Sequence, residues 1–394
     1  METGTSFQLK SKTNSLLLVG FLVAIVCFAI GLFKAPERTW VNYLINNFYF
    51  VSMALSGGFI LSIAYAANGN WSAPFKRILE AMTAYLPVGL VLTLGLYFGL
   101  HTLYEWTHHD VVMADPILSS KTYWLNIPGY MLRIVIFFVP WILFTKALRY
   151  FSRKQDQTGS LNETKSLIKT AVLFLIFFAF SFSLASFDWI MSLEPHWFST
   201  IFGVYTFSGL FTAGLAFVIL TTIFLESKGY LKGAITEDNY HDLGKLLFGF
   251  STFWAYIWFS QYLLIWYSNI PEETIYYYIR EKHTWDWLFY LNLAINWIVP
   301  FFALMTRDSK RSRFILGRVC IVVLIGHWLD LYLMVAPNVY KHAGITNPSI
   351  GVIEVLMALG VGCLFTWVVA RALGKAPLLA KNDPYLEEAH NLHQ

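Results

Sequence analysis

Charged residues are scarce in this chain: Asp, Glu, Lys and Arg make up 13% of its 394 residues, whereas 57% of the residues are hydrophobic. An ordinary soluble domain carries about 25% charged residues. The scarcity excludes a soluble enzyme, a disordered chain and a disulfide-built secreted domain, and it predicts a protein embedded in a lipid bilayer. The net charge of +4 is too small and too dispersed to indicate binding to nucleic acid.

Cysteine is also rare. The three cysteines, Cys27, Cys320 and Cys363, lie inside apolar runs and show no CxxC spacing. Neither a disulfide framework nor a thiolate metal site is therefore expected. The sequence also lacks a Walker loop, a GxGxxG fingerprint and a nucleophile elbow, so no motif indicates nucleotide-dependent or hydrolytic chemistry.

Long apolar runs, by contrast, recur along the whole chain. Each has about the 20 residues that an α-helix needs to cross a bilayer. They predict ten transmembrane helices, at residues 15–33, 43–67, 78–100, 126–148, 167–190, 198–225, 244–269, 284–305, 314–335 and 348–373. Because the runs are apolar on most faces, we expect an all-α integral membrane domain over residues 1–394, rather than a β-barrel with alternating segments of about ten residues.

The Lys and Arg residues orient these spans, because basic residues accumulate on the cytoplasmic side of a membrane. With both termini inside, the inner segments hold 21 of the 28 Lys and Arg residues, the outer segments hold 6, and Arg133 lies within a span. The sequence thus predicts a multi-pass membrane protein with both termini in the cytoplasm. Residues 374–394 are expected to form a cytoplasmic tail.

Short motifs recur at offsets of 142 to 160 residues between the two halves of the chain. They are Ser56-Gly57 with Ser208-Gly209, Val139-Pro140-Trp141 with Val299-Pro300-Phe301, and Asp188 with Asp330, each Asp followed seven residues later by a proline. The members of each pair cross the membrane in the same direction, which predicts a tandem parallel repeat. We expect two four-helix bundles, spans two to five at 43–190 and spans six to nine at 198–335, flanked by spans one and ten. A chance match of short apolar strings is the alternative.

Ionisable residues inside the spans are the first candidates for function, because charge is costly to bury in a bilayer. Basic residues near the cytoplasmic ends are set aside, since long side chains reach water from there. Asp286 lies close to the outer interface, which favours a structural role. The remaining candidates for a proton relay or a quinone contact are Asp188, His327, Asp330, Glu354, Arg133 and Glu80. No catalytic residue is predicted.

His327 and Asp330 are three residues apart, and this spacing places them on one face of a helix. The carboxylate could then orient the imidazole or pass it a proton. With Arg133 as counter-charge, an outward-opening cluster of acids and a histidine suits proton movement to the outer face or hydrogen bonding to a quinol head group. The alternative is a set of interhelical ion pairs and hydrogen bonds that hold the bundle together.

The other histidines do not favour a bound cofactor. A haem held by two histidines needs facing partners within the helices, and only His327 lies well inside a span. The outer run of His101, His108, His109, Asp110 and Asp115 has ligands that a metal ion uses. Its position on an outer loop instead favours contact with a partner or with solvent, so no metal site is predicted.

Two blocks of the sequence resemble a known family. The first is residues 187–197, FDWIMSLEPHW, continuing into 199–203, STIFG. The second combines 253–256, FWAY, with 259–261, FSQ, and 266–274, WYSNIPEET. Both are similar to the F subunit of alternative complex III, the bacterial quinol:cytochrome c oxidoreductase that is unrelated to cytochrome bc complexes. That family belongs to the NrfD and polysulfide-reductase superfamily of membrane subunits, whose members resemble one another in having paired four-helix bundles.

The resemblance implies a subunit of the respiratory electron-transport chain that binds no cofactor of its own. The partners it implies are a homologous C subunit, a multihaem cytochrome, an iron-sulfur protein, a monohaem cytochrome and small membrane subunits, with the haems and iron-sulfur clusters in those partners. It places quinol oxidation in the C subunit, so quinone or menaquinol would be a transient ligand of this chain. This sequence lacks the histidine-rich opening span of the C subunit, which favours the F assignment.

Proton conduction through buried acids is a further hypothesis that the resemblance supplies, for Asp188, His327, Asp330, Glu354 and Glu80. Two alternatives stay open from the sequence. One is a purely structural anchor of the complex, with the same charges joining helices. The other is a secondary transporter, although parallel motifs without strongly broken helices do not favour it.

Overall fold

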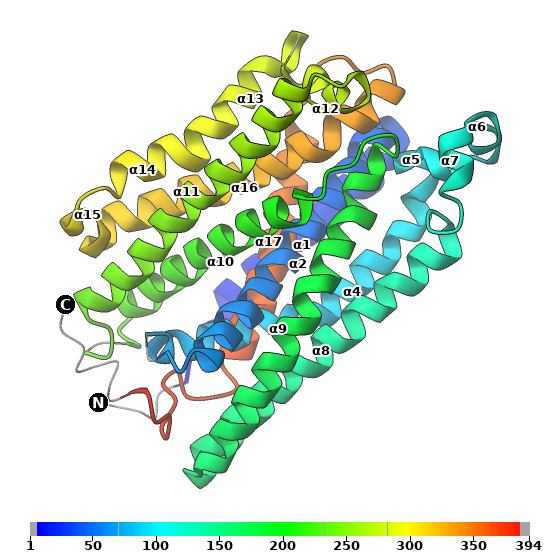
Figure 1. Ribbon diagram of the computed structural model, residues 1–394. Helices are drawn as coiled ribbons and strands as arrows, with labels where there is room; N and C mark the ends of the chain where they lie inside the picture. The colour runs from blue at the N-terminus through cyan, green and yellow to red at the C-terminus, as the bar shows by residue number, and fades with distance from the viewer. Residues whose placement is uncertain (1–5, 70, 232, 282, 387–394) are drawn as a thin grey trace.

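The computed structural model describes residues 6–69, 71–231, 233–281 and 283–386. Within these ranges the chain is built of helices joined by turns and short loops, and it forms no β-strand, only an isolated bridge between Ser6 and Pro377 (Figure 1). The expected all-α class is confirmed.

Within the described ranges, eight helices are long and apolar enough to cross a membrane. They are α1 (Ser11–Lys34), α2 (Pro36–Ala66), the run Ala73–Leu103, α8 (Ile127–Thr158), α9 with a following 3-10 turn (Leu161–Leu193), α10 (Phe202–Ser227), α16 (Arg313–His342) and α17 (Val352–Leu373). The run Ala73–Leu103 contains α3 (Lys76–Met82), α4 (Leu86–Gly95) and α5 (Leu100–Leu103), joined by 3-10 turns. These helices coincide with eight of the ten expected spans.

The other two expected spans, 244–269 and 284–305, are helical but are not among the eight. The first lies in α11 (Glu237–Ser268), which is 32 residues long but rich in Trp and Tyr, whose polar ring atoms make it less apolar. The second is divided into α13 (Asp286–Leu293), a π-helical turn (Ala294–Ile298) and α14 (Val299–Ala303). The number of ten spans therefore stays a prediction.

Short helices lie between the long ones. They are α6 (His109–Ala114), α7 (Pro116–Ser120), α12 (Pro271–Glu281) and α15 (Arg307–Arg311). The helices α6 and α7 form the compact loop that projects at the upper right of Figure 1. The helix α12 lies at the same end of the molecule, before α13, so both halves of the chain carry helical loops there.

Helix ends follow capping residues rather than the edges of apolar runs. The helix α8 begins after Asn126, whose side chain accepts a hydrogen bond from the Gly129 amide at 2.7 Å. It ends at Gly159, whose φ of +63° suits a residue without a Cβ atom. The expected span 126–148 is thus only the apolar part of a 32-residue helix, because apolarity marks the bilayer and not the end of the backbone hydrogen bonding.

The prolines of the matched motifs lie in different local structures. Pro140 lies inside the continuous helix α8, whereas Pro300 follows directly after the π-helical turn. Pro337 lies inside α16, whereas Pro195 lies in a turn beyond the end of α9. A proline inside a helix removes one backbone hydrogen bond, a loss that falls on α8 and α16, whereas Pro195 lies outside any helix and Pro300 lies in the first turn of α14.

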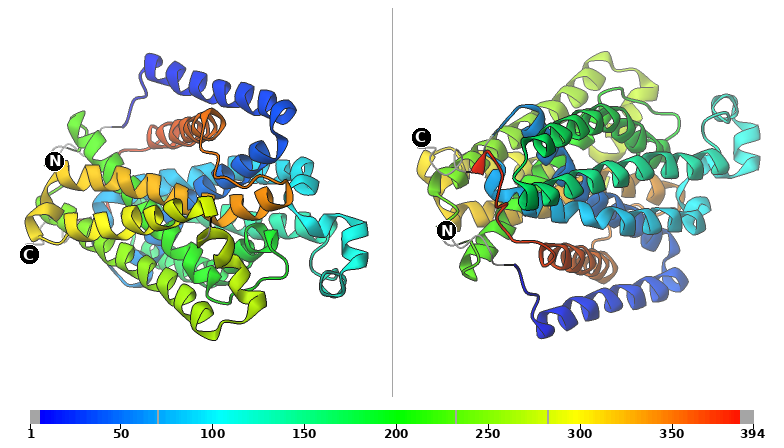
Figure 2. Two further views of the ribbon diagram at one scale, coloured as in Figure 1. Left: turned by 90° about the horizontal axis from the view of Figure 1, so that it is seen from above. Right: turned by 90° about the horizontal axis from the view of Figure 1, so that it is seen from below.

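The helix α2 is the centre of the molecule. In the most apolar 18-residue stretch of α2, 89% of the residues are buried, whereas in that of α1 only 11% of the residues are buried. It contacts α4 and α9, which in turn contact α8, and it contacts α10 and α16, which contact α11 and α14. The helix α1 packs on α17 at the periphery, and Figure 2 shows this pair outermost in both views.

The two described ends of the chain meet, because Ser6 and Pro377 pair in an antiparallel bridge. The segments next to both termini therefore lie at one end of the bundle (Figure 1). Residues 387–394 of the expected tail lie outside the described residues.

Candidate functional site

The carboxyl group of Asp330, on α16, is the meeting point of four helices. Tyr205 of α10 donates its hydroxyl proton to Oδ1, and Asn292 of α13 donates from Nδ2 to the same oxygen at 2.8 Å. Trp254 of α11 donates from Nε1 to Oδ2 at 3.0 Å. The Asp330 residue is only 2% exposed. All three donors are neutral, so among the described residues the carboxyl group is held by hydrogen bonds and not by an ion pair.

His327 lies one turn before Asp330 and is also buried. Neither Nδ1 nor Nε2 of its ring has a hydrogen-bond partner among the described residues. The ring instead meets the Trp254 ring edge-on, with centroids 5.7 Å apart. The expected orientation of the imidazole by Asp330 is therefore not found, because both oxygens of that carboxyl group are taken by donors from other helices.

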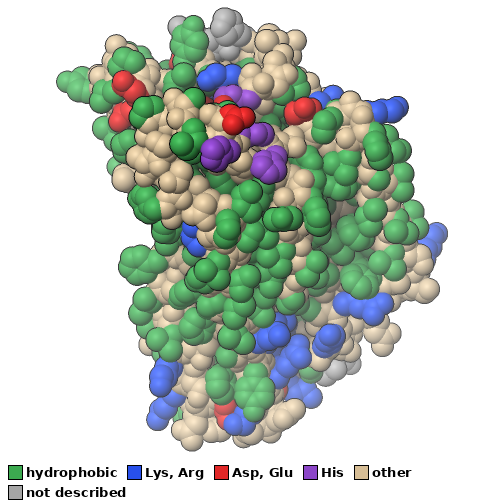
Figure 3. Space-filling model, turned by 90° about the vertical axis from the view of Figure 1, so that its right-hand side faces the viewer, with side chains coloured by type: hydrophobic (Ala, Val, Ile, Leu, Met, Phe, Trp, Pro, Cys, Tyr) green, Lys and Arg blue, Asp and Glu red, His purple; other side chains and the backbone are tan. Residues whose placement is uncertain are grey.

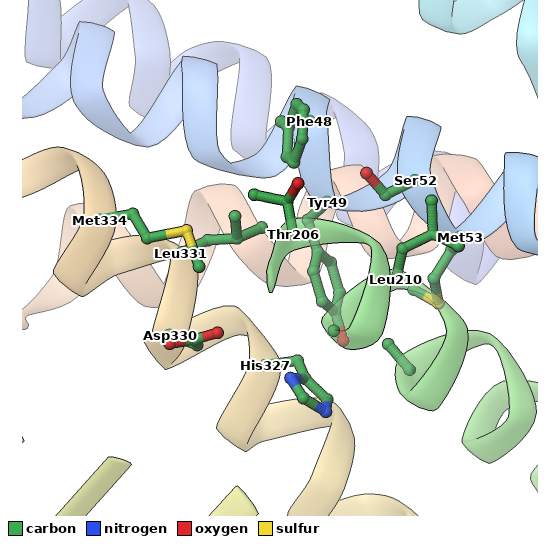
Figure 4. Close-up of a pocket in the computed structure, with 12 residues that line it drawn as sticks. Phe48, Tyr49, Ser52, Met53, Thr206, Leu210, His327, Asp330, Leu331 and Met334 are labelled. Atoms are coloured by element: carbon green, nitrogen blue, oxygen red, sulfur yellow. The ribbon is translucent and has the colours of Figure 1, made fainter. Parts of the chain in front are cut away.

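A small cavity separates this pair from the first half of the chain. Its volume is about 20 Å³, which is enough for one water molecule. Figure 4 shows that the side chains around it come from α2, α10 and α16: Phe48, Tyr49, Ser52, Met53, Thr206, Leu210, His327, Asp330, Leu331 and Met334. Ser52 Oγ, like the His327 nitrogens, is buried and without a partner among the described residues. Ser52, His327 and Asp330 are thus polar residues that line a space of water size.

Gly209 is the residue that leaves this space open. A Cβ atom at this position would lie 3.3 Å from His327 Nδ1 and 4.0 Å from Asp330 Oδ2. A larger residue would therefore press on the imidazole and fill part of the cavity. Gly209 of the Ser208-Gly209 motif thus belongs to the wall of the site.

Asp188, the expected counterpart of Asp330, has a different environment. Arg133 of α8 donates from Nε to Asp188 Oδ2, and Trp124 donates from Nε1 to Oδ1 at 2.7 Å. The guanidinium of Arg133 also lies over the Trp124 ring, 4.4 Å from its centroid. Arg133 thus pairs with Asp188, and it is not among the donors to Asp330.

Glu354, at the start of α17, is fully buried and closely held. Arg38 of α2 donates from Nη2 to Oε2 at 2.8 Å and from Nε to Oε1 at 3.2 Å. Asn42 donates from Nδ2 to Oε1 at 3.1 Å, and the Gly351 amide donates to Oε2 at 2.8 Å. This carboxylate caps its own helix and joins α17 to α2.

Glu80, on α3, belongs to a separate basic and acidic network. Arg77 donates from Nη1 to Glu80 Oε2 at 2.6 Å and to Ser152 Oγ at 2.9 Å. Through Nη2 it also donates to Asp156. The second oxygen of Glu80, Oε1, has no hydrogen-bond partner among the described residues. This network joins α3 to α8.

The predicted candidates thus fall into several groups. The structure brings His327 and Asp330 to one cavity and pairs Arg133 with Asp188. Glu354 and Glu80 each have their own arginine. Asp286 is exposed at the start of α13, where its side chain accepts from the Trp287 amide at 2.7 Å.

Sequence reasoning named Arg133, the partner of Asp188, as a counter-charge, but it missed the donors to Asp330 and the arginine that binds Glu354. Tyr205, Trp254 and Asn292 are uncharged, and Arg38 was counted with the outer segments. Asn292 could have been singled out from the sequence, because it is a strongly polar residue inside an apolar run. Trp254 lies in the second of the two resemblance blocks and Asp188 in the first, so each block contributes to one buried carboxyl group.

Histidines and acids of the outer loops form pairs with one another. His196 Nε2 lies 2.5 Å from Asp115 Oδ2, and His342 Nδ1 lies 2.7 Å from Glu105 Oε1. The hydrogen bond from His342 lowers the pKa of Glu105 below its usual value. No group of three or more His, Cys, Asp and Glu side chains suited to a metal ion occurs in the described ranges, the outer histidine run included.

No protein-family model matches this chain, and no curated protein matches it.

Proposed function

We propose that this chain is an integral membrane subunit of a quinol:cytochrome c oxidoreductase of the alternative complex III type. It lies in the bacterial cytoplasmic membrane with both termini in the cytoplasm. The proposal is supported by the two sequence blocks that resemble the F subunit. The first block contains the buried Asp188, and the second contains Trp254, which donates to the buried Asp330. The bridge between Ser6 and Pro377 supports an even number of spans.

The proposed architecture is ten spans in two parallel four-helix bundles, flanked by the first and last helices. Two observations support it. The helices α2, α4, α8 and α9 contact one another, as do α10, α11, α14 and α16. The helix α2 also contacts α10 and α16, which joins the two groups along the cavity beside His327.

Within this subunit, His327 and Asp330 form the proton-carrying site. The observation that carries this assignment is the water-sized cavity lined by a buried carboxyl group and by an imidazole with two unpartnered nitrogens. Three neutral donors stabilise Asp330 as a carboxylate. Since none of the described cations pairs with Asp330, a proton that this carboxylate gains need not displace a described ion-pair partner. A water in the cavity then joins Asp330 to the imidazole.

The other acids are paired with arginines: Asp188 and Glu354 each join two helices in this way, whereas Glu80 and Arg77 lie on the same helix, α3. Asp188, Glu354 and Glu80 each bind an arginine within hydrogen-bonding distance. A proton taken up by such a carboxylate must displace its ion pair with the guanidinium, which makes the pair a poor proton carrier. This observation favours, for these three residues, the structural-anchor role. Quinone contact is proposed as transient, with the haems and iron-sulfur clusters in the partner subunits.

The test is made in the intact complex purified from native membranes. Asp330→Asn is expected to lower proton release coupled to quinol:cytochrome c turnover by about 100-fold, the lower end of the effect of a positioned acid or base. The matched control is Glu354→Gln, a buried acid outside the cavity, which is expected to lower the yield of complex but not the turnover of each assembled complex. Unchanged proton release in the Asp330 variant would remove this residue from the mechanism.

Co-purification tests the proposal independently. Cytochromes and an iron-sulfur protein should accompany the chain when it is extracted from native membranes in mild detergent. A chain that emerges alone would contradict the assignment to an oxidoreductase complex, whatever the behaviour of Asp330.

A further inference from the structure

One face of α8 changes from apolar to basic along its length. Residues spaced by three or four positions share a face of a helix, and such a stripe runs through Leu132, Ile136, Val139, Leu143, Lys146, Tyr150, Arg153 and Gln157. The first four side chains are apolar and 41% to 60% exposed. The stripe therefore faces away from the core over its whole apolar part.

The length of the apolar part matches one leaflet of a bilayer. Leu132 and Leu143 are 11 residues apart, which at a rise of about 1.5 Å per residue spans about 16 Å. The hydrocarbon core of a bilayer is about 30 Å thick, so half of it is about 15 Å. Figure 3 shows hydrophobic side chains covering the middle of this side of the molecule and basic side chains gathering near its lower end.

The basic end of the stripe borders a recess of about 490 Å³. It is lined by Lys146, Arg149, Tyr150, Arg153, Lys154 and Gln157. Lys154 pairs with Glu163 at 2.8 Å, whereas Lys146, Arg149 and Arg153 form no ion pair with any described residue. Among the described residues, the recess thus presents three cations without a bound carboxylate.

Two further details point to an anionic ligand. Arg153 Nε is buried and lacks a hydrogen-bond partner among the described residues. Glu80 lies behind Arg149 and Arg153, across a void of about 10 Å³, but its Oε2 is already bound by Arg77. Glu80 and Glu163 pair with Arg77 and Lys154, and among the described residues neither acid pairs with the other three cations of the recess.

We propose that this recess binds the head group of an anionic phospholipid, with an acyl chain lying along the apolar stripe from Leu143 to Leu132. Arg and Lys side chains suit the phosphate, and Tyr150 lies at the level where aromatic rings favour the interface. The apolar stripe is continuous with the recess, and this favours a lipid as the ligand. A soluble anion or an acidic peptide has no acyl chain to lie along an apolar surface as long as one leaflet is thick. The proposal needs only the position of the chain in a bilayer and not the oxidoreductase role.

The test is native mass spectrometry of the complex, or of the full chain if it is extracted alone, titrated with phosphatidylglycerol and with phosphatidylcholine of matched acyl chains. The wild type should retain phosphatidylglycerol preferentially. Lys146→Gln combined with Arg153→Gln should weaken that binding about 30-fold, since each basic residue near an anionic lipid contributes a factor of about five. The matched control is Lys165→Gln with Lys169→Gln on α9, two exposed cations outside the recess, which should leave binding unchanged.

Three results would overturn the proposal: equal binding of the two lipids, an equal loss in the control, or binding of glycerol phosphate as tight as that of the whole lipid. Loss of an acidic protein from the variant complex, with lipid retention unchanged, would assign the recess to a protein partner instead. If the double variant does not fold, Lys146→Gln alone removes an exposed side chain and should weaken binding about fivefold. None of these results depends on whether cytochromes co-purify.

Discussion

Arg280 of α12 donates from Nε to the main-chain oxygen of Leu333 at 2.7 Å. Leu333 lies four residues before Pro337, so its carbonyl is the one that the proline leaves without a helical donor. Arg280 is only 2% exposed, and its Nη2 also donates to the Met334 oxygen at 3.0 Å. The buried guanidinium of Arg280 thus supplies the hydrogen-bond donor that Pro337 lacks in α16, the helix that carries Asp330.

Removing this cation should loosen α16. Arg280→Gln deprives the Leu333 carbonyl of its donor, and an unsatisfied buried acceptor costs about 1–3 kcal/mol. Thermal unfolding of the purified chain in detergent is expected to show a lower midpoint. Arg318→Gln is the control, because Arg318 is exposed on the same helix. Equal midpoints for the two variants would contradict a structural role for Arg280.

Filling the cavity beside His327 should lower proton release without lowering the stability of the fold. Gly209→Ala places a methyl group about 3.3 Å from His327 Nδ1, so it should displace the water and lower proton release per turnover. Gly249→Ala is the control, since a Cβ atom there meets nothing within 4 Å. Both changes replace glycine inside a helix and should gain about 0.5–1 kcal/mol from backbone entropy. Identical proton release in the two variants would refute the cavity as part of the pathway.

Breaking the pair between Glu354 and Arg38 should weaken the junction of α17 with α2. Glu354→Gln leaves the guanidinium without its carboxylate, and because Arg38 is 26% exposed we expect a loss of about 2 kcal/mol rather than the 3–5 kcal/mol of a fully buried pair. The yield of folded chain and its unfolding midpoint measure this. Arg38→Gln should have a similar effect, and a loss confined to one of the two variants would show that the ion pair is not the cause.

Acid should release the loop that contains Glu105 from the end of α16. The hydrogen bond from His342 lowers the pKa of Glu105 from 4.5, so the carboxylate form is favoured in the folded chain. The resulting stability is present above pH 4.5 and is lost as the pH falls through the lowered value. Unfolding midpoints of the wild type and of Glu105→Gln should therefore differ at neutral pH and converge in acid. A constant difference across this range would exclude Glu105 as the cause.

Much of the helical framework was predictable because the bilayer restricts the backbone so strongly. A chain inside hydrocarbon must satisfy its own backbone hydrogen bonds, which selects helices, and their length follows from the thickness of the core. The prediction was least complete around α11 and α13, where Trp and Tyr lower the apolarity and a π-helical turn divides the helix. The observed ends of α8 also differ from those of the predicted span 126–148, because local capping by Asn126 and Gly159 sets them.

The candidate site was predictable only in part. Asp330 is conspicuous in the sequence because an acid inside an apolar run is costly. Its donors Tyr205, Trp254 and Asn292 are uncharged and lie 125, 76 and 38 residues away in sequence, and no local pattern connects them.

The sequence by itself determined that this chain is an all-α membrane protein, because apolar length and the bilayer's demand for satisfied backbone groups leave few other structures. It also determined which buried acids to examine. Only the tertiary structure decided their partners: Asp188 binds Arg133, Glu354 binds Arg38, and Asp330 alone is held by neutral donors beside a water-sized cavity. The physical reason is that hydrogen bonds and ion pairs between helices depend on how helices far apart in sequence pack, which hydropathy does not encode.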